Sequence, residues 1–176
     1  MATVDQAADR HTAVTTGWST PTNAYATTGD NVYATAAPGK NLTVDGDFGF
    51  PSLASIPAGS TINSVVLTLE WGMTASVTGG TLGVQGRNNN VADSAAEVTK
   101  TTTAEAQSTF TFGTLPSLTD LQTAGRVVGR VRCTKGNTTN AMTGNLDFVF
   151  MTVTYTAPSG KRITVKMQAV NRASSY

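Results

Sequence analysis

The chain has 176 residues, with 12 basic and 11 acidic side chains, and only 13% of its residues are charged. This length suits one domain that buries its core without disulfide staples. The sparse, balanced charge argues against a nucleic-acid-binding protein, which shows a basic excess, and against charge-driven disorder. A composition rich in Thr and Gly and poor in Glu and Lys is typical of a β protein with many turns.

The first twelve residues are polar and lack the apolar run of a signal peptide. We expect either a flexible tail or an arm that becomes ordered against a neighbouring subunit. We therefore divide the chain into an arm (1–12), a β-sandwich domain (13–157) and a C-terminal strand with a tail (158–176). No apolar run is long enough for a membrane span, so we expect no membrane partner.

Three aromatic residues follow the arm, within the turn-rich stretch 14–37: Trp18, Tyr25 and Tyr33. Aromatic side chains in such a setting usually fill one end of a sandwich. The alternative is a platform of flat rings that stacks on the sugar rings of a glycan. The sequence leaves both hypotheses open, with the structural one favoured.

The stretch 47–71 carries the clearest β signal of the chain. A strand over 41–50 leads into a Pro/Gly corner at 56–60, and Val65, Leu67, Leu69 and Trp71 then alternate with smaller or polar residues. This pattern predicts a long, half-buried central strand. The acidic pair in Asp45-Gly46-Asp47 lacks the other oxygen ligands of a calcium loop, so we expect two solvent-facing carboxylates or a bulge.

Downstream, Thr78-Gly79-Gly80 predicts a hairpin connection into a strand over 81–87. The segment Leu115–Ala124 is the one helical candidate, because Pro116 stands at its start and Gly125 just past its end. A strand over 126–133 follows, and its single Cys133 is predicted to be a small core residue. The sequence thus predicts an all-β, jelly-roll-like antiparallel β-sandwich with one short helix.

Three arginines of that strand, Arg126, Arg130 and Arg132, are predicted to share one face. Such a stripe is most often solvated and paired with acidic residues of a neighbouring strand. A subunit contact is the alternative, since Arg is favoured at interfaces.

Two later segments are candidates for subunit contacts. The strand over 145–155 is apolar on both faces, which predicts burial on two sides, either by another subunit or by a loop and the short helix. The segment 163–169 alternates strictly and is expected to pair at a sheet edge, in its own chain or in a neighbour. The predicted interface residues are Val149, Met151, Val153, Ile163, Val165 and Met167.

Catalytic signals are scarce. His11 is the only histidine and Cys133 the only cysteine, which excludes a histidine-based triad and zinc sites built from several His or Cys ligands. Glu70 and Asp147 are carboxylates on long strands, but nothing in the sequence places them together, and pairing with the arginine stripe is the plainer use. We expect no cofactor and no metal, and a hydrolase is the least favoured hypothesis.

Two stretches carry a resemblance: GWSTPTNAYATTGDNVYATAAP over 17–38 and FGFPSLASIPAGSTINSVVLTLEW over 48–71. Together they resemble a module of tailed-bacteriophage virion proteins of the minor capsid, head-decoration or minor tail type. The resemblance covers roughly the first half of the chain and the closing long strand, and it brings no catalytic residues. Bacterial surface carbohydrate-binding modules share some of these features.

The resemblance implies a non-enzymatic structural protein on the exterior of the head or on the tail, made in the host cytoplasm. Its expected partners are other capsid or tail subunits and further copies of itself, with a cell-surface glycan as a further candidate. The alternative function is a carbohydrate-binding β-sandwich module, for which Trp18, Tyr25 and Tyr33 are the candidate stacking residues.

Overall fold

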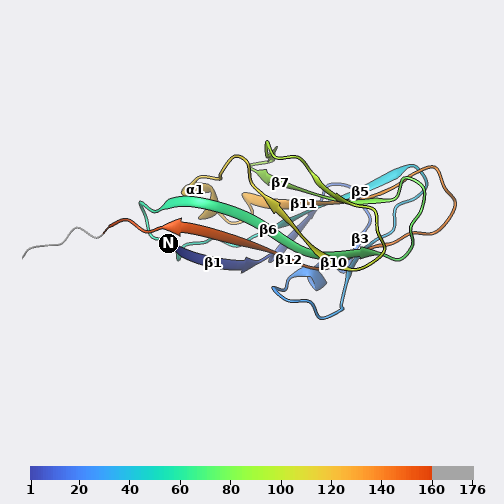
Figure 1. Cartoon of the computed structure of the whole chain (residues 1–176), viewed down its shortest axis with the longest axis horizontal. Helices are drawn as coiled ribbons and strands as arrows, with labels where there is room; N and C mark the ends of the chain where they lie inside the picture. The colour runs from blue at the N-terminus through green and yellow to red at the C-terminus, as the bar shows by residue number, and fades with distance from the viewer. Residues whose placement is uncertain (160–176) are drawn as a thin grey trace, which may run out of the picture.

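The computed structural model describes residues 1–159, which fold into two six-stranded antiparallel sheets stacked face to face (Figure 1). The predicted jelly-roll-like β-sandwich is therefore confirmed. The segment 163–169, with Ile163, Val165 and Met167, lies outside the described residues. Within 1–159, no helix is long and apolar enough to cross a membrane.

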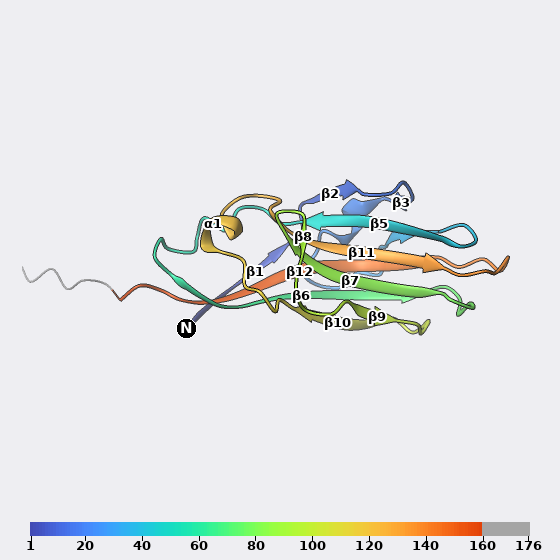
Figure 2. The same cartoon turned by 90° about the horizontal axis from the view of Figure 1, so that it is seen from above.

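One sheet is centred on β6 and β12, and the other on β5 and β11 (Figure 2). The β6–β12 sheet contains β10 (Ala106–Thr111), β6 (Thr61–Met73), β12 (Gly144–Thr156), β4 (Ala34–Ala36) and β3 (Trp18–Ser19), with β1 (Ala2–Ala7) also paired to β12. The β5–β11 sheet contains β2 (Arg10–Ala13), β5 (Leu42–Gly49), β11 (Val127–Lys135), β7 (Thr81–Asn88) and β8 (Val91–Ala92), with β9 (Val98–Lys100) also paired to β7.

The core lies between the sheets and follows the predicted alternation. Val65, Leu67 and Leu69 of β6 are fully buried, while the residues between them are half-exposed on the outer face. Each buried side chain of this size stabilises the fold by roughly 1.5–3 kcal/mol. Cys133 is also fully buried, as predicted, and burial raises the pKa of its thiol to about 12. It is a core residue without thiolate chemistry.

The predicted Pro/Gly corner and the helix are found where the sequence places them. At the corner before β6, the Ser60 amide donates to the Pro57 carbonyl, and Gly59 has the positive φ that favours glycine. The helix is shorter than predicted: α1 spans Leu118–Leu121, and the Ser117 hydroxyl caps it by accepting from the Asp120 amide. A 3-10 turn, η1, spans Pro21–Ala24.

The N-terminal residues do not form a tail or an arm. Ala2–Ala7 pair with β12 and Arg10–Ala13 pair with β5, so this stretch contributes one strand to each sheet. This corrects the expectation for 1–12. The strands escape sequence analysis because only Val4 in β1 is a large apolar residue, which leaves too little alternation to detect.

The connection after β6 is not a hairpin. β6 and β7 belong to different sheets, so the stretch around Gly79 crosses from one layer to the other. Gly79 has φ +69, as a turn glycine would, and a Cβ there would lie 2.9 Å from the backbone of Gly136. The turn chemistry was predicted correctly, but a turn signal does not reveal which sheet the next strand joins.

Both faces of β12 are buried in part, which accounts for its apolar residues on both sides. Val149, Met151 and Val153 lie opposite Leu69, Leu67 and Val65 and are at most 1% exposed. They are core residues of this chain, so the expectation that they contact a neighbouring subunit is corrected. Phe148, on the other face, is buried as well, beside η1 and the loop that follows it.

Beyond that loop, the outer face of the β6–β12 sheet is almost free of charge. The register places the outward side chains of β1, β12, β6 and β10 in continuous rows across the sheet. We call this surface the threonine face; it consists of Thr3, Asp5, Ala7, Ser64, Val66, Thr68, Thr109, Thr111, Phe150, Thr152 and Thr154. Its one charge, Asp5, accepts a hydrogen bond from the Thr152 hydroxyl at 2.6 Å.

Candidate functional site

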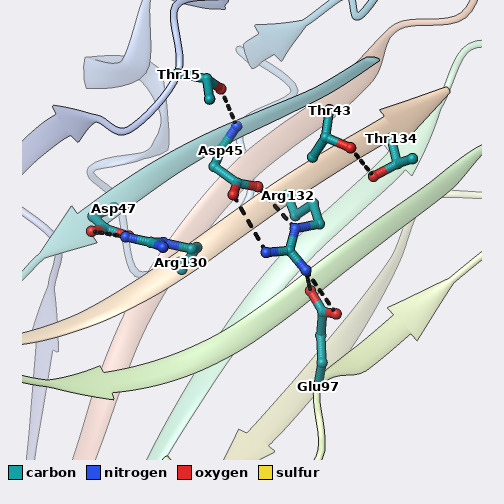
Figure 3. Close-up of polar contacts among 8 residues, drawn as sticks. All are labelled: Thr15, Thr43, Asp45, Asp47, Glu97, Arg130, Arg132 and Thr134. Atoms are coloured by element: carbon teal, nitrogen blue, oxygen red, sulfur yellow. Dashed lines mark hydrogen bonds and ion pairs between the residues drawn. The ribbon is translucent and has the colours of Figure 1, made fainter. Parts of the chain in front are cut away.

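The outer face of the β5–β11 sheet, which we call the ionic face, carries ion pairs among Asp45, Asp47, Glu97, Arg130 and Arg132 (Figure 3). The register of β11 against β5 sets Arg130 directly opposite Asp47 and Arg132 directly opposite Asp45. The Arg130 guanidinium donates to both oxygens of Asp47, at 2.7 and 2.8 Å, and the two side chains are only 17% and 9% exposed. This two-bond geometry is the strong form of a charge-assisted hydrogen bond.

Arg132 connects β11 to β5 and to the residue that precedes β9. Its Nε donates to Asp45 at 2.9 Å, and its Nη1 lies 3.2 Å from a carboxylate oxygen of Glu97, which precedes β9. These acidic neighbours raise the pKa of Arg132, although burial opposes the shift. The prediction that the arginines pair with acidic residues of neighbouring strands is confirmed for Arg130 and Arg132, and the expected partner Glu70 is not among those residues.

Arg126 lies outside this face. It precedes β11, and its Nε lies 3.1 Å from Asp120, beside the N-cap of α1. Asp120 also accepts from the Asn88 side chain at 3.0 Å and from the Ser117 hydroxyl at 2.7 Å, and these two hydrogen bonds hold the pKa of its carboxyl below the usual value. The predicted stripe of three arginines thus divides into a pair on the sheet and one residue at its end.

Arg126 and Asp120 line a pocket of about 530 Å³. The pocket lies beside the β7–β8 turn, where Asn89 and Asn90 both have positive φ, as a two-residue hairpin of this kind requires. Other side chains project hydrogen-bonding groups into it, and the Asn88 Oδ1 atom is buried without a partner. Its polar lining consists of Asn88, Asn89, Asp93, Ser94, Thr114, Asp120 and Arg126.

The Asp93 carboxylate fixes one wall of the pocket through hydrogen bonds from backbone amides. Its carboxylate accepts from the amides of Ala95 and Gly113 at 2.8 and 2.7 Å and from the Thr114 amide at 2.9 Å. Burial raises the pKa of Asp93, but the backbone hydrogen bonds together outweigh it and the pKa is lowered. The pocket therefore has a fixed polar wall that can receive hydroxyl groups or other hydrogen-bonding ligands.

A second polar cluster lies at the far edge of the threonine face. One carboxylate oxygen from each of Glu70, Glu105 and Asp147 lies within 4.8 Å of the other two. Asp147 stands at a β-bulge in β12, only 2% exposed, and accepts from the amides of Asp30 and Asn31 at 3.3 Å. No sequence pattern brings Glu70 and Asp147 together; the bulge does so by turning Asp147 out of the regular alternation.

The three carboxylates of this cluster lie close enough to repel one another. Burial, followed by the nearby charges of Glu105 and Asp147, raises the pKa of Glu70. The Tyr33 hydroxyl donates to Glu105 at 2.7 Å, and this bond raises the pKa of Tyr33 to about 12. Lys100, which donates to the Trp71 carbonyl at 2.7 Å, is close enough to offset part of the negative charge.

These carboxylates are the described residues best placed to hold a cation. Calcium takes six to eight oxygen ligands, whereas the cluster offers one oxygen from each of three side chains. Asp147 is already bonded to the backbone of the loop and Glu105 to Tyr33. We infer that the cluster fastens the loop around Gly29–Tyr33 to the sheet, and we assign no metal to it.

The three predicted aromatic residues do not form one platform. The Trp18 ring packs edge-on against Phe48 at 5.5 Å, and its indole nitrogen is buried without a partner. Tyr25 is half-buried against the core. Tyr33 belongs to the acidic cluster, so the structural interpretation of Trp18 and Tyr25 is favoured over sugar stacking by three adjacent rings.

Comparison with known proteins defines no family. No family model and no curated protein sequence matches the chain. Among solved structures, TmCBM61 in complex with β-1,4-galactotriose has 9% identity and a TM-score of 0.44, over 81% of this chain and 86% of that one. The CBM36-1 domain of a xylanase from the hindgut metagenome of Trinervitermes trinervoides has 9% identity and a TM-score of 0.42, over 91% and 100%.

The xylan-binding module CBM15 is similarly distant, with 16% identity and a TM-score of 0.42, over 85% of this chain and 99% of that one. At TM-scores below 0.5, none of these structures identifies a ligand or a binding residue of this chain. The candidate sites therefore stand on their own geometry.

Sequence analysis missed the pocket and the acidic cluster for different reasons. The pocket is assembled from a hairpin turn, two loops and an N-cap, none of which carries a motif. Glu105 lies in a polar loop before β10, with nothing to mark it as a neighbour of Glu70. The one available signal was the pair Asn89-Asn90, which predicts a tight turn and hence a rigid rim.

Proposed function

We propose that this chain is a non-enzymatic structural subunit of a bacteriophage virion, on the exterior of the head or on the tail. It works by contacts between its sheet surfaces and other subunits. The observation that carries this proposal is the threonine face, a broad sheet surface with one charged residue. Depletion of charged residues is characteristic of the core of a protein interface.

The sequence supports the same proposal. The stretches 17–38 and 48–71, which resemble virion modules, contain the loop fastened by Asp147, the rigid corner before β6 and most of β6. These are the elements that shape the sandwich and cover one end of the threonine face. Several carboxylates have structural roles that require no reaction: Asp45, Asp47 and Asp120 form ion pairs, and Asp93 and Asp147 fasten loops.

The test is to analyse particles released by the host that carries the gene. Mass spectrometry of purified particles should detect the chain in a fixed ratio to the major capsid or tail protein. Cryo-EM should then place the sandwich on the particle with its threonine face against a neighbour. Particles that lack the chain altogether would remove the proposal.

A second candidate function is glycan binding, and the pocket beside α1 favours it. Carboxylate, amide and guanidinium groups converge there on a volume that suits one or two sugar rings. A glycan array with the purified chain tests this function. Binding that disappears in Arg126→Ala, with an unchanged melting temperature, would support it, and an array without binders would dismiss it.

A further inference from the structure

The edge strand β10 is unusually open. It has six residues, AQSTFT, with no charge and no proline, and in the described part of the chain it pairs with β6 alone. Proteins normally protect long edges with charged residues, proline or short strands. The other edges follow that rule: β2 contains Arg10, β9 contains Lys100, β1 contains Asp5, and β3 and β8 have two residues each.

The pattern of hydrogen bonds between β10 and β6 shows which backbone groups of β10 do not bond to β6. The register continues past Thr111, where the Phe112 amide donates to the Val65 carbonyl at 3.0 Å. Because hydrogen-bonded and non-hydrogen-bonded pairs alternate in an antiparallel ladder, the N–H and C=O groups of Gln107, Thr109 and Thr111 point away from β6. They form a row that an additional strand can pair with.

The chain itself contains a segment suited to this row. Ile163, Val165, Met167 and Ala169 alternate with polar residues, a pattern that predicts a strand. Residues 160–176 carry four basic side chains and no acidic one, which leaves eight basic and eleven acidic residues in 1–159. Residues 160–176 therefore carry a net positive charge, whereas residues 1–159 carry a net negative charge.

The acidic side chains also lie in the right place. Glu105 immediately precedes β10, and Glu70 lies opposite Gln107 on the neighbouring strand. A strand paired to the open edge would bring Arg162, Lys166 or both close to these carboxylates. Burial and, after it, the negative charges of Glu105 and Asp147 raise the pKa of Glu70, and the basic side chains of such a strand would offset those charges.

The segment reaches this edge more easily in a neighbouring copy than in its own chain. From Thr156, an added strand beyond β10 is three strand spacings away, about 14 Å, and its start opposite Thr111 is about 17 Å along the sheet. The diagonal is about 22 Å, and the seven steps from Thr156 to Ile163 span only about 23 Å when fully extended. A neighbouring copy is free of this constraint.

We propose that the segment 163–169 of one copy adds as a strand to the β10 edge of a second copy. This interface gives the virion subunit proposed above a self-assembly contact, and it rests on that function only for its biological setting. Main-chain hydrogen bonds to Gln107, Thr109 and Thr111 supply affinity, and the basic side chains supply orientation beside Glu70 and Glu105.

The experiment is sedimentation of the full chain with three variants. Thr109→Pro removes an edge N–H that does not bond to β6, and Val165→Pro changes only the added segment. Thr109→Ala is the matched comparison, because it loses the same side chain but retains the N–H. Both proline variants should weaken self-association at least tenfold, and Thr109→Ala should weaken it much less than Thr109→Pro does.

Two results would overturn the proposal. One is a monomer at protein concentrations of about 100 μM, which would also be the outcome if the segment paired within its own chain. The other is self-association that Val165→Pro leaves unchanged, a test that does not depend on the stability of β10. If the chain is monomeric yet present in purified particles, the edge contact fails while the virion function stands.

Discussion

The two outer faces of the sandwich differ in how their polar groups find partners. The outer face of the β5–β11 sheet satisfies its charges internally, through Arg130 with Asp47 and Arg132 with Asp45 and Glu97. The threonine face has almost no charge to satisfy and ends at the open strand β10. One face is therefore complete within the chain, and the other is built from groups that remain available to a partner.

The difference has an energetic basis. Ion pairs that are hydrogen-bonded and half-buried are costly to break, so they fix the register of β5 against β11. Hydroxyl and small apolar side chains cost less to remove from water than charged side chains do, which suits a surface that is covered only on assembly. Substitutions on either face separate these two roles, and those in the buried ion pairs should be the most destabilising.

The Asp47–Arg130 pair should matter most for stability. Asp47→Ala leaves the Arg130 guanidinium without its partner in a site where it is 17% exposed, and should lower the free energy of unfolding by about 2–4 kcal/mol. The control is Asp9→Ala, whose pair with Arg10 is 42% exposed on both sides and should contribute less than about 1 kcal/mol. Urea titration measures both, and equal effects would contradict the contrast.

Acid should affect two carboxylates with opposite signs. The pKa of Asp93 is lowered in the folded chain, so its stabilisation is present above the usual value of 3.8 and is lost as the pH falls through the lower folded value. The pKa of Glu70 is raised, so its contribution is present below the usual value of 4.5 and is lost as the pH rises through the higher folded value.

Urea titration between pH 3 and pH 7 separates these two sites. Asp93→Asn should reduce the loss of stability in acid, because it removes a group that must be protonated on unfolding. It should also lower stability at pH 7 by about 1–3 kcal/mol, through weaker bonds to three amides. If the variant loses as much stability at acidic pH as the unmodified chain, the hydrogen bonds from the amides of the pocket wall do not depend on the charge of Asp93.

A charge placed on the threonine face should affect assembly more than folding. Thr154→Lys introduces an ammonium group at a half-exposed position and should change the unfolding free energy by about 0.5 kcal/mol or less. If this face is a contact, its self-association or binding to particles should weaken about tenfold. The matched control is Thr99→Lys, on β9 beside the ionic face, which should have no effect on either.

The smallest effect is expected in the acidic cluster. Glu70→Gln removes one of three neighbouring negative charges, so at pH 7 it should leave stability unchanged or raise it by less than about 1 kcal/mol. Urea titration compares this variant with Asp147→Asn. A clear loss of stability in Glu70→Gln would mean that the Glu70 carboxylate makes a net favourable interaction, and not that it is repelled by its neighbours. Asp147→Asn should be the more damaging of the two, because Asp147 accepts from two loop amides.

Sequence reasoning performed best where a single local rule dictates the structure. The alternation in β6, the Pro57–Gly59 corner and the buried Cys133 each follow from side-chain type and spacing alone. The same holds for Arg130 and Arg132, since acidic residues at the same spacing lie on a strand that proved to be adjacent.

It failed where the result depends on tertiary context. The polar strand β1 forms because β12 offers an edge for it to pair with, and not because of its own pattern. Val149, Met151 and Val153 were expected at an interface because a two-sided apolar strand does not reveal which face meets the core. The acidic cluster depends on a bulge at Asp147, and bulges have no reliable sequence signature.

The most direct test of the central claim is the position of the chain in purified particles. A cryo-EM map should show the sandwich on the particle exterior with the threonine face and the β10 edge covered by neighbouring subunits, and with the ionic face toward solvent. A map in which the ionic face makes the contacts while the threonine face and β10 stay exposed would contradict the account.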